Sequence, residues 1–150
     1  MSYEIEVIEA DPTPAAVIET RCATAELGEV LGQCFGRVVQ HIMGSGHTPL
    51  GMPFLRYLEM TPDSLLIQAG LPSTAPAGED VLAIELPGGK LATTLYLGPY
   101  GDVGPAWEAM GAWAAERGLS FAGGWDVYEN DPDTVADESE LRTRLFLPAE

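Results

Sequence analysis

A carboxylate set between aromatic residues is the feature of the sequence best suited to chemistry. The stretch 123–130, GGWDVYEN, alternates as a strand does, so Trp125 points to one face and Asp126 and Tyr128 point to the other. Aromatic rings offer negative faces to a cation, and a desolvated carboxylate supplies the opposite charge. The pattern predicts a site for a lipophilic cation. The alternative is that Asp126 lies on the surface and the tyrosines pack at the edge of the core.

Other aromatic residues extend this candidate site. Tyr96 and Tyr100 flank a Gly-Pro turn, and Trp107 follows on a predicted helix. The expected ligand-binding residues are Tyr57, Tyr96, Trp107, Trp125, Asp126 and Tyr128. If the protein were an enzyme, Asp126 would be its acid or base.

The residue patterns of several common enzymes are missing. The sequence has no GxSxG, and neither His41 nor His47 has a matched nucleophile, so we expect His41 to be an exposed helix residue. The sequence LPGGK at 86–90 lacks the spacing of a phosphate loop and reads as a hairpin turn.

Metal and redox chemistry are not indicated either. The acidic stretch 130–140 lacks the glycine of a calcium loop and reads as a solvated insertion, able at most to bind Ca²⁺ weakly. Cys22 and Cys34 have no CxxC spacing and are expected to be reduced thiols. We expect no metal site and no cofactor.

The central stretch 90–117 is predicted to be a strand, a turn and a helix. Residues 90–97 alternate, and Gly98-Pro99 ends the strand. Asp102 is the expected helix cap, with Pro105 in the first turn and Arg117-Gly118 at the end. The helix face expected to be apolar comprises Val103, Trp107, Met110 and Ala114.

The remaining elements follow the same signals. Strands are expected over residues 3–9, 15–22, 52–59 and 65–71. A helix capped by Thr24 is expected to begin near Ala25 and to end at Gly44-Ser45-Gly46, with Cys34 on its apolar face. Small residues at 72–78 form a linker.

The two halves of the chain resemble each other at a constant offset. A shift of 76 residues places Leu31 on Trp107, Leu65 on Leu141, and Leu71-Pro72 on Leu147-Pro148. This predicts an α+β fold of duplicated strand-strand-helix-strand-strand modules, at about 3–72 and 79–148 of a single domain. They would form a pseudo-twofold, mostly antiparallel sheet with both helices on one face and a ligand groove between the modules.

Composition limits the partners. The apolar fraction of 46% indicates a globular protein, while 23 acidic against 7 basic residues give a formal charge of −16. This charge disfavours direct binding to nucleic acid or anionic membranes and favours cationic partners. With no membrane span, signal peptide or helix-turn-helix evident, we expect a free-standing cytoplasmic protein, monomeric or homodimeric.

Several of these motifs together resemble the GyrI-like small-molecule-binding family, the effector-binding domain of AraC-type regulators. They are YLGPYGDVGPAWEAMGAWAAERGL, WDVYENDPD, ELRTRLFLP and PFLRYLEM. The resemblance implies duplicated modules around an aromatic ligand groove, with a family glutamate that falls on Asp126 here. The shorter side chain is a departure from the family, and Glu129 is the alternative acid.

Three functions are compatible with this resemblance. The leading one is binding of lipophilic or cationic drug-like molecules, for effector sensing in multidrug transcription regulation or for sequestration. The second is hydrolysis of cyclopropane-bearing DNA-alkylating drugs, with Asp126 as the acid or base. The third is inhibition of a basic protein partner such as a gyrase.

Overall fold

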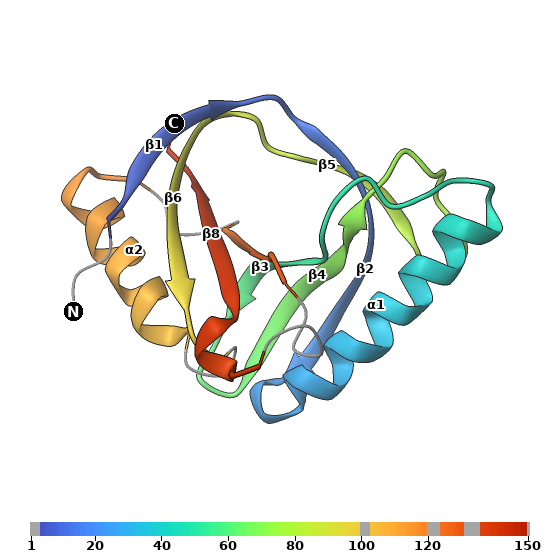
Figure 1. The fold of residues 1–150 in the computed structure, drawn as a ribbon, viewed down its shortest axis with the longest axis horizontal. Helices are drawn as coiled ribbons and strands as arrows, with labels where there is room; N and C mark the ends of the chain where they lie inside the picture. Colours follow the sequence, from blue (N-terminus) through green and yellow to red (C-terminus); the bar gives the residue numbers. More distant parts are fainter. Residues whose placement is uncertain (1–3, 100–102, 120–123, 131–135, 150) are drawn as a thin grey trace. The chain divides into compact units, whose positions relative to one another are not determined.

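A computed structural model of the chain describes residues 4–99, 103–119, 124–130 and 136–149. The chain divides into two compact units (Figure 1). Unit 1 comprises Met1–Asp11 and Gly88–Glu150, and unit 2 comprises Pro12–Pro87. Each unit is an antiparallel sheet with one long helix.

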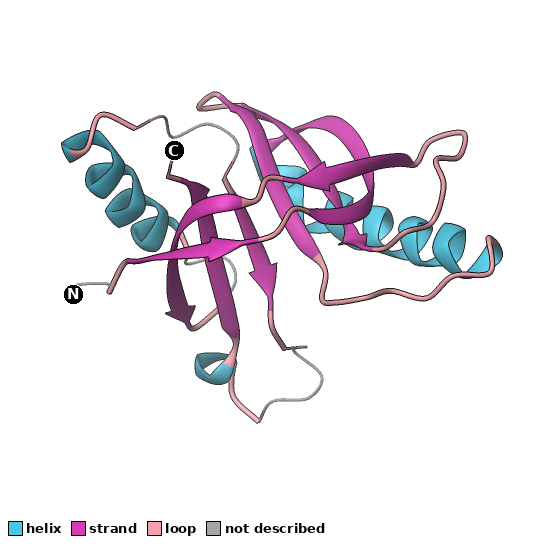
Figure 2. Ribbon diagram, turned by 90° about the horizontal axis from the view of Figure 1, so that it is seen from above, coloured by secondary structure: helices cyan, strands magenta, loops and turns pink. Residues whose placement is uncertain are grey.

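Unit 2 has four strands and the longer helix. Its elements are β2 (Thr13–Ala23), α1 (Leu27–Gly44), β3 (Phe54–Met60), β4 (Ser64–Pro72) and β5 (Leu82–Leu86). The strand order is β3-β4-β2-β5, and every pairing in it is antiparallel. Helix α1 packs on β2 and β4, and Figure 2 shows it running along one side of these strands.

Helix α1 forms because its apolar residues repeat at helical spacing and can be buried against the sheet. Cys34, Val38 and Ile42 are buried on that face, as the sequence predicts. The expected cap at Thr24 is wrong, because a short 3-10 turn, η1 (Thr24–Glu26), precedes the helix and neither start has a side-chain cap. The chain leaves the helix through Gly46, whose positive φ of 83° favours glycine.

Unit 1 contains the first strand and the second half of the chain. Its elements are β1 (Glu6–Ala10), β6 (Gly89–Leu97), α2 (Gly104–Glu116), β7 (Trp125–Tyr128), η4 (Glu138–Glu140) and β8 (Arg142–Pro148). The order is β1-β6-β8-β7, again antiparallel throughout. Helix α2 packs on β6, with Pro105 in its first turn as predicted. Asp102, the expected cap, lies outside the described residues.

The mostly antiparallel α+β fold is confirmed, but the hairpin predicted at residues 86–90 is wrong. Strand β5 pairs with β2, and β6 pairs with β1, so the LPGGK segment passes from unit 2 to unit 1. Each unit thus takes its outer strand from the other predicted module. The order β5-β2-β4-β3 matches β1-β6-β8-β7 element by element. The duplication itself and the groove between modules stay predictions.

The core of unit 1 lies between its sheet and α2. Ala92 and Tyr96 of β6, Leu145 and Leu147 of β8, and Met110 of α2 are buried there. Because side chains alternate along a strand, residues opposite these positions share the same face. No helix in the described part of the chain is long and apolar enough to cross a membrane.

Candidate functional site

The carboxyl group of Asp126 is buried in unit 1. It lies on β7 opposite Leu145 of β8, on the face that α2 covers, and is 1% exposed. Its Oδ2 accepts a hydrogen bond of 3.0 Å from the indole Nε1 of Trp107. The alternative of a surface position for Asp126 is therefore wrong.

Helix α2 and a glycine position the Trp107 ring. Trp107 is half-buried and packs against the core cluster around Met110. A Cβ added to Gly124 would lie 2.9 Å from the nearest carbon of the Trp107 ring and 3.1 Å from the carbonyl oxygen of Phe146. Glycine at 124 thus makes room for the ring beside the start of β7.

The bond from Trp107 orients the carboxyl group without cancelling its charge. An indole N–H is a neutral donor, so this bond leaves the formal charge of an ionised Asp126 in place. A buried charge calls for an opposite charge nearby, because burial removes the stabilisation by water. An ionised carboxylate in such a position attracts positively charged groups.

Two of the predicted tyrosines share this face of the sheet. Tyr96 on β6 and Tyr128 on β7 both lie opposite Thr143 of β8. Tyr96 is buried, and its hydroxyl donates to the carbonyl oxygen of Pro99 over 3.0 Å. The structure thus puts Tyr96, Trp107, Asp126 and Tyr128 on the α2 side of one sheet.

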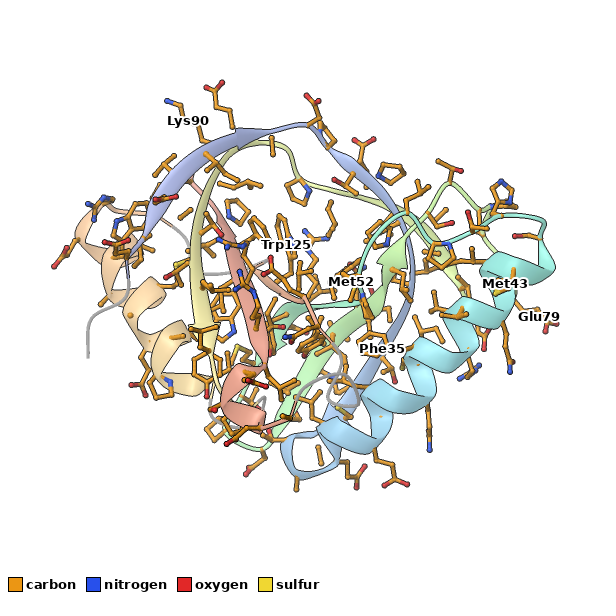
Figure 3. The ribbon with its side chains drawn as sticks, viewed as in Figure 1. Phe35, Met43, Met52, Glu79, Lys90 and Trp125 are labelled. Carbon is orange, nitrogen blue, oxygen red and sulfur yellow. The ribbon has the colours of Figure 1, made fainter. Side chains whose placement is uncertain are left out.

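The other predicted residues lie elsewhere. Trp125, labelled in Figure 3, points to the opposite face of β7, where its ring stacks on Phe146 with centroids 5.5 Å apart. Tyr57 belongs to unit 2, where it pairs with Ile67. Tyr100 lies outside the described residues. Ligand contacts by Trp125 and Tyr57 stay predictions.

Glu129, the alternative acid, is engaged in ion pairs. Its carboxylate meets the Nε of Arg142 at 3.3 Å and the Nε of Arg144 at 3.0 Å. Two guanidinium groups offset its charge. The choice between Asp126 and Glu129 as the acid that meets a ligand stays a prediction. Arg142 and Arg144 lie two residues apart on β8, so they share one face of that strand.

The histidine and cysteine side chains serve the packing of unit 2. His41, expected to be exposed, is half-buried, and its Nε2 lies 2.7 Å from the carbonyl oxygen of Pro76. Cys22 and Cys34 are free buried thiols, and burial raises the pKa of each. No cluster able to hold a metal occurs among the residues that the structure describes.

A polar pocket in unit 1 was missed by the sequence analysis. It has a volume of about 290 Å³ and is lined by Glu4, Glu6, Thr93, Thr94, Leu95 and Arg144. Glu6 lies opposite Thr93, and Leu95 lies opposite Arg144. These positions are on the face away from Asp126. Alternating acids in YEIEVIEA were the available signal, but strand pairing was needed to bring them to Thr93.

The family comparison assigns the chain to a class of small-molecule binding domains. Residues 3–150 match the GyrI-like small molecule binding domain, and the chain belongs to this family. The resemblance noted from the motifs is thereby confirmed. No curated protein matches the sequence.

Solved structures share the fold at low sequence identity. The EcmrR C-terminal domain has a TM-score of 0.70 at 17% identity, with 100% of this chain and 99% of that chain covered. EcmrR in its complex with DNA has a TM-score of 0.79 at 15% identity, but the match covers 99% of this chain and only 57% of the EcmrR chain.

Two further structures extend the range of functions found on this fold. SAV2435 bound to tetraphenylphosphonium has a TM-score of 0.62 at 10% identity, covering 100% of this chain and 94% of that one. A hydrolase from Listeria innocua has a TM-score of 0.60 at 10% identity, and the match covers 98% of this chain and 92% of that chain. At these identities the likeness concerns the fold alone.

Proposed function

We propose that this domain binds a lipophilic organic cation, with the carboxylate of Asp126 selecting for positive charge. The observation that carries the proposal is the buried Asp126 carboxyl held by the neutral Trp107 N–H at 3.0 Å. The rings of Trp107, Tyr96 and Tyr128 on the same side supply faces that attract cations. Family membership supports a small-molecule ligand.

The biological role that we propose is effector sensing or sequestration. EcmrR carries a domain of this fold in a protein that binds DNA, and SAV2435 holds tetraphenylphosphonium. A domain of this kind converts the presence of a ligand into a change of conformation or removes the ligand from solution. The formal charge of −16 raises the local concentration of cations near the surface.

Calorimetric titration with tetraphenylphosphonium tests the proposal. The native protein should bind it saturably, and Asp126→Asn should weaken binding by about tenfold or more, because removing one partner of a buried charge pair costs about 3 to 5 kcal/mol. The Asn side chain keeps an oxygen that can accept the Trp107 hydrogen bond, so the charge alone changes.

Two controls isolate the charge of Asp126. Glu108→Gln removes an equal charge from an exposed position on α2 and should leave affinity unchanged. Triphenylphosphine oxide, a neutral analogue, should bind the native and Asp126→Asn proteins equally. Equal affinity of both proteins for tetraphenylphosphonium would rule out Asp126 as the selecting group.

Hydrolysis of cyclopropane-bearing alkylating drugs is the second candidate. It is favoured by the shared fold with a hydrolase from Listeria innocua and by a buried carboxyl that could take a proton from attacking water. Mass spectrometry of such a drug after incubation decides: ring-opened product formed by the native protein and lost in Asp126→Asn would support the enzyme. Unchanged drug would exclude it.

A further inference from the structure

The polar pocket of unit 1 has the features of a second binding site. Its lining comes from three neighbouring strands or their ends: Glu4 and Glu6 at β1, Thr93 to Leu95 on β6, and Arg144 on β8. A volume of about 290 Å³ corresponds to about ten water molecules at roughly 30 Å³ each. This is the lower end of the range for small-molecule pockets.

The charges around the pocket favour a cation. Glu4 and Glu6 are acidic and exposed, whereas Arg144, the one basic residue among the described residues of the lining, is already paired with Glu129 at 3.0 Å. The hydroxyl of Thr94 donates to the backbone oxygen of Glu4 over 2.7 Å and ties the start of the first strand to β6. Among the described residues of the lining, the two carboxylates of Glu4 and Glu6 therefore outnumber the positive charges.

Thr93 gives an independent sign of a ligand. Its side chain is 4% exposed, and its Oγ1 has no hydrogen-bond partner among the described residues. A buried hydroxyl without a partner destabilises a protein, because it gives up its hydrogen bonds to water. Thr93 lies opposite Glu6 on the same face, so a ligand between them can restore the missing bond.

The lining also tells which cations suit the pocket. Among the described residues that line it, none is aromatic and Leu95 is the only large apolar side chain. A flat lipophilic cation would find little to stack on here, whereas a hydroxylated amine would find carboxylates for its ammonium group and Oγ1 of Thr93 for a hydroxyl.

We propose that this pocket binds a small hydrophilic organic cation that carries both an ammonium and a hydroxyl group, such as an amino sugar. The ammonium group lies between the carboxylates of Glu4 and Glu6, and a hydroxyl bonds to Thr93. The site is distinct from that at Asp126, because Thr93, Leu95 and Arg144 lie on the opposite face of the sheet from Asp126.

Three ring compounds of similar size test the chemistry by calorimetry. Glucosamine has both groups, glucose lacks the ammonium, and cyclohexylamine lacks the hydroxyls. Glucosamine should bind, and each of the other two should bind about tenfold more weakly, as expected for the loss of one charge-assisted or buried hydrogen bond. The proposal is overturned if glucosamine shows no binding at concentrations up to about 10 mM, because its dissociation constant would then lie above the millimolar range.

Matched variants locate the site. Thr93→Val should weaken glucosamine binding about tenfold, and Thr93→Ser should retain it, because Ser keeps the hydroxyl. Thr143→Val is the control, because Thr143 is also a buried threonine whose hydroxyl has no hydrogen-bond partner among the described residues. Thr143 lies on the face of Tyr96, so this variant should leave glucosamine binding unchanged. Equal affinity of the Thr93→Val and native proteins would contradict the proposal.

A second pair of variants tests the charge. Glu6→Gln should weaken glucosamine binding, whereas Glu9→Gln, on the same strand but on its other face, should not. An equal loss of glucosamine affinity in the two variants would show that only the net charge matters, and would contradict a binding site at Glu6. Tetraphenylphosphonium binding should survive Glu6→Gln, so failure of this proposal is distinguishable from failure of the site at Asp126.

Discussion

At the scale of single residues, the hydrogen bond from Trp107 to Asp126 links helix α2 to strand β7. It joins positions 19 residues apart and satisfies one oxygen of a carboxyl that is 1% exposed. Removing one partner of a buried hydrogen bond costs more than the bond contributes, because the remaining group has lost its water.

We therefore expect Trp107→Phe to lower the free energy of unfolding by about 1 to 3 kcal/mol, measured by urea denaturation. The phenyl ring keeps much of the apolar contact but cannot donate to Asp126. Trp113→Phe is the matched control, because Trp113 is half-buried on the same helix with the Arg117 guanidinium 4.2 Å from its ring centroid. A loss at Trp107 no larger than that at Trp113 would contradict this account.

At the scale of elements, α1 shows how one face of a helix carries its stability. Ile42 is fully buried, while its neighbour Met43 is 62% exposed and points to solvent (Figure 3). A short helix is held mainly by packing of its apolar face, so neighbouring positions should differ strongly in their contribution.

Ile42→Ala should therefore lower the free energy of unfolding by about 2 to 5 kcal/mol, the usual cost of such a cavity. Met43→Ala should change it by no more than about 0.5 kcal/mol, as is usual at exposed positions. Thermal or urea unfolding of both variants measures the difference. Similar losses in the two variants would mean that α1 is not docked on β2 and β4 by this face.

The free energy of unfolding should also depend on pH, through the buried thiols of Cys34 on α1 and Cys22 on β2. Burial raises the pKa of the Cys34 thiol from its ordinary value of 9.0, although Arg37 acts in the opposite direction, and burial also raises the pKa of Cys22. The unfolded chain releases these protons at lower pH than the folded protein does. Their stabilising contribution is thus complete below pH 9 and is lost as the pH rises through the folded pKa values.

We expect the free energy of unfolding to fall between pH 8 and pH 10 more steeply in the native protein than in a Cys22→Ala, Cys34→Ala double variant. Urea denaturation at each pH measures both slopes. The double variant is the control for lysine and tyrosine groups, which titrate in the same range. Equal slopes would show that the buried thiols are not the cause.

At the scale of the whole molecule, the excess of acidic residues opposes compactness. A formal charge of −16 on 150 residues produces repulsion that dissolved salt screens, with a Debye length falling from about 10 Å at 0.1 M to about 3 Å at 1 M. Net charge of this kind destabilises the folded state while it aids solubility.

The melting temperature should therefore rise as NaCl is raised from low concentration to about 0.5 M, by about 2 to 4 °C for each kcal/mol of repulsion that is screened. Differential scanning calorimetry measures this rise. Near the isoelectric point the effect should vanish, because little net charge remains to be screened. An equal rise in melting temperature at neutral pH and near the isoelectric point would indicate a general salt effect and contradict this prediction.

The sequence predicted local structure better than long-range pairing. Alternation located β6 and β7, and helical spacing found the buried face of α1, because these signals act over a few residues. The exchange of outer strands, β1 to β6 and β5 to β2, depends on contacts across the chain that no local pattern encodes. The wrong hairpin at 86–90 has this cause.

The candidate site was predictable to the same extent. Alternation separated Trp125 from Asp126 correctly, but it could not show that Trp107 would donate to Asp126 or that Gly124 would make room for that ring. The pocket beside Thr93 depends on pairing of β1 with β6, so neither Glu4 nor Glu6 was identified as part of a site.

The central claim, that a lipophilic cation is bound beside the Trp107–Asp126 pair, is tested most directly by NMR of the indole N–H signals. Titration with tetraphenylphosphonium should shift the Nε1–H resonance of Trp107 saturably, with Trp113 as the reference and assignments from the Trp→Phe variants. Asp126→Asn should abolish that shift at the same ligand concentration. An unmoved Trp107 resonance at concentrations where calorimetry shows binding would place the ligand elsewhere and contradict the account.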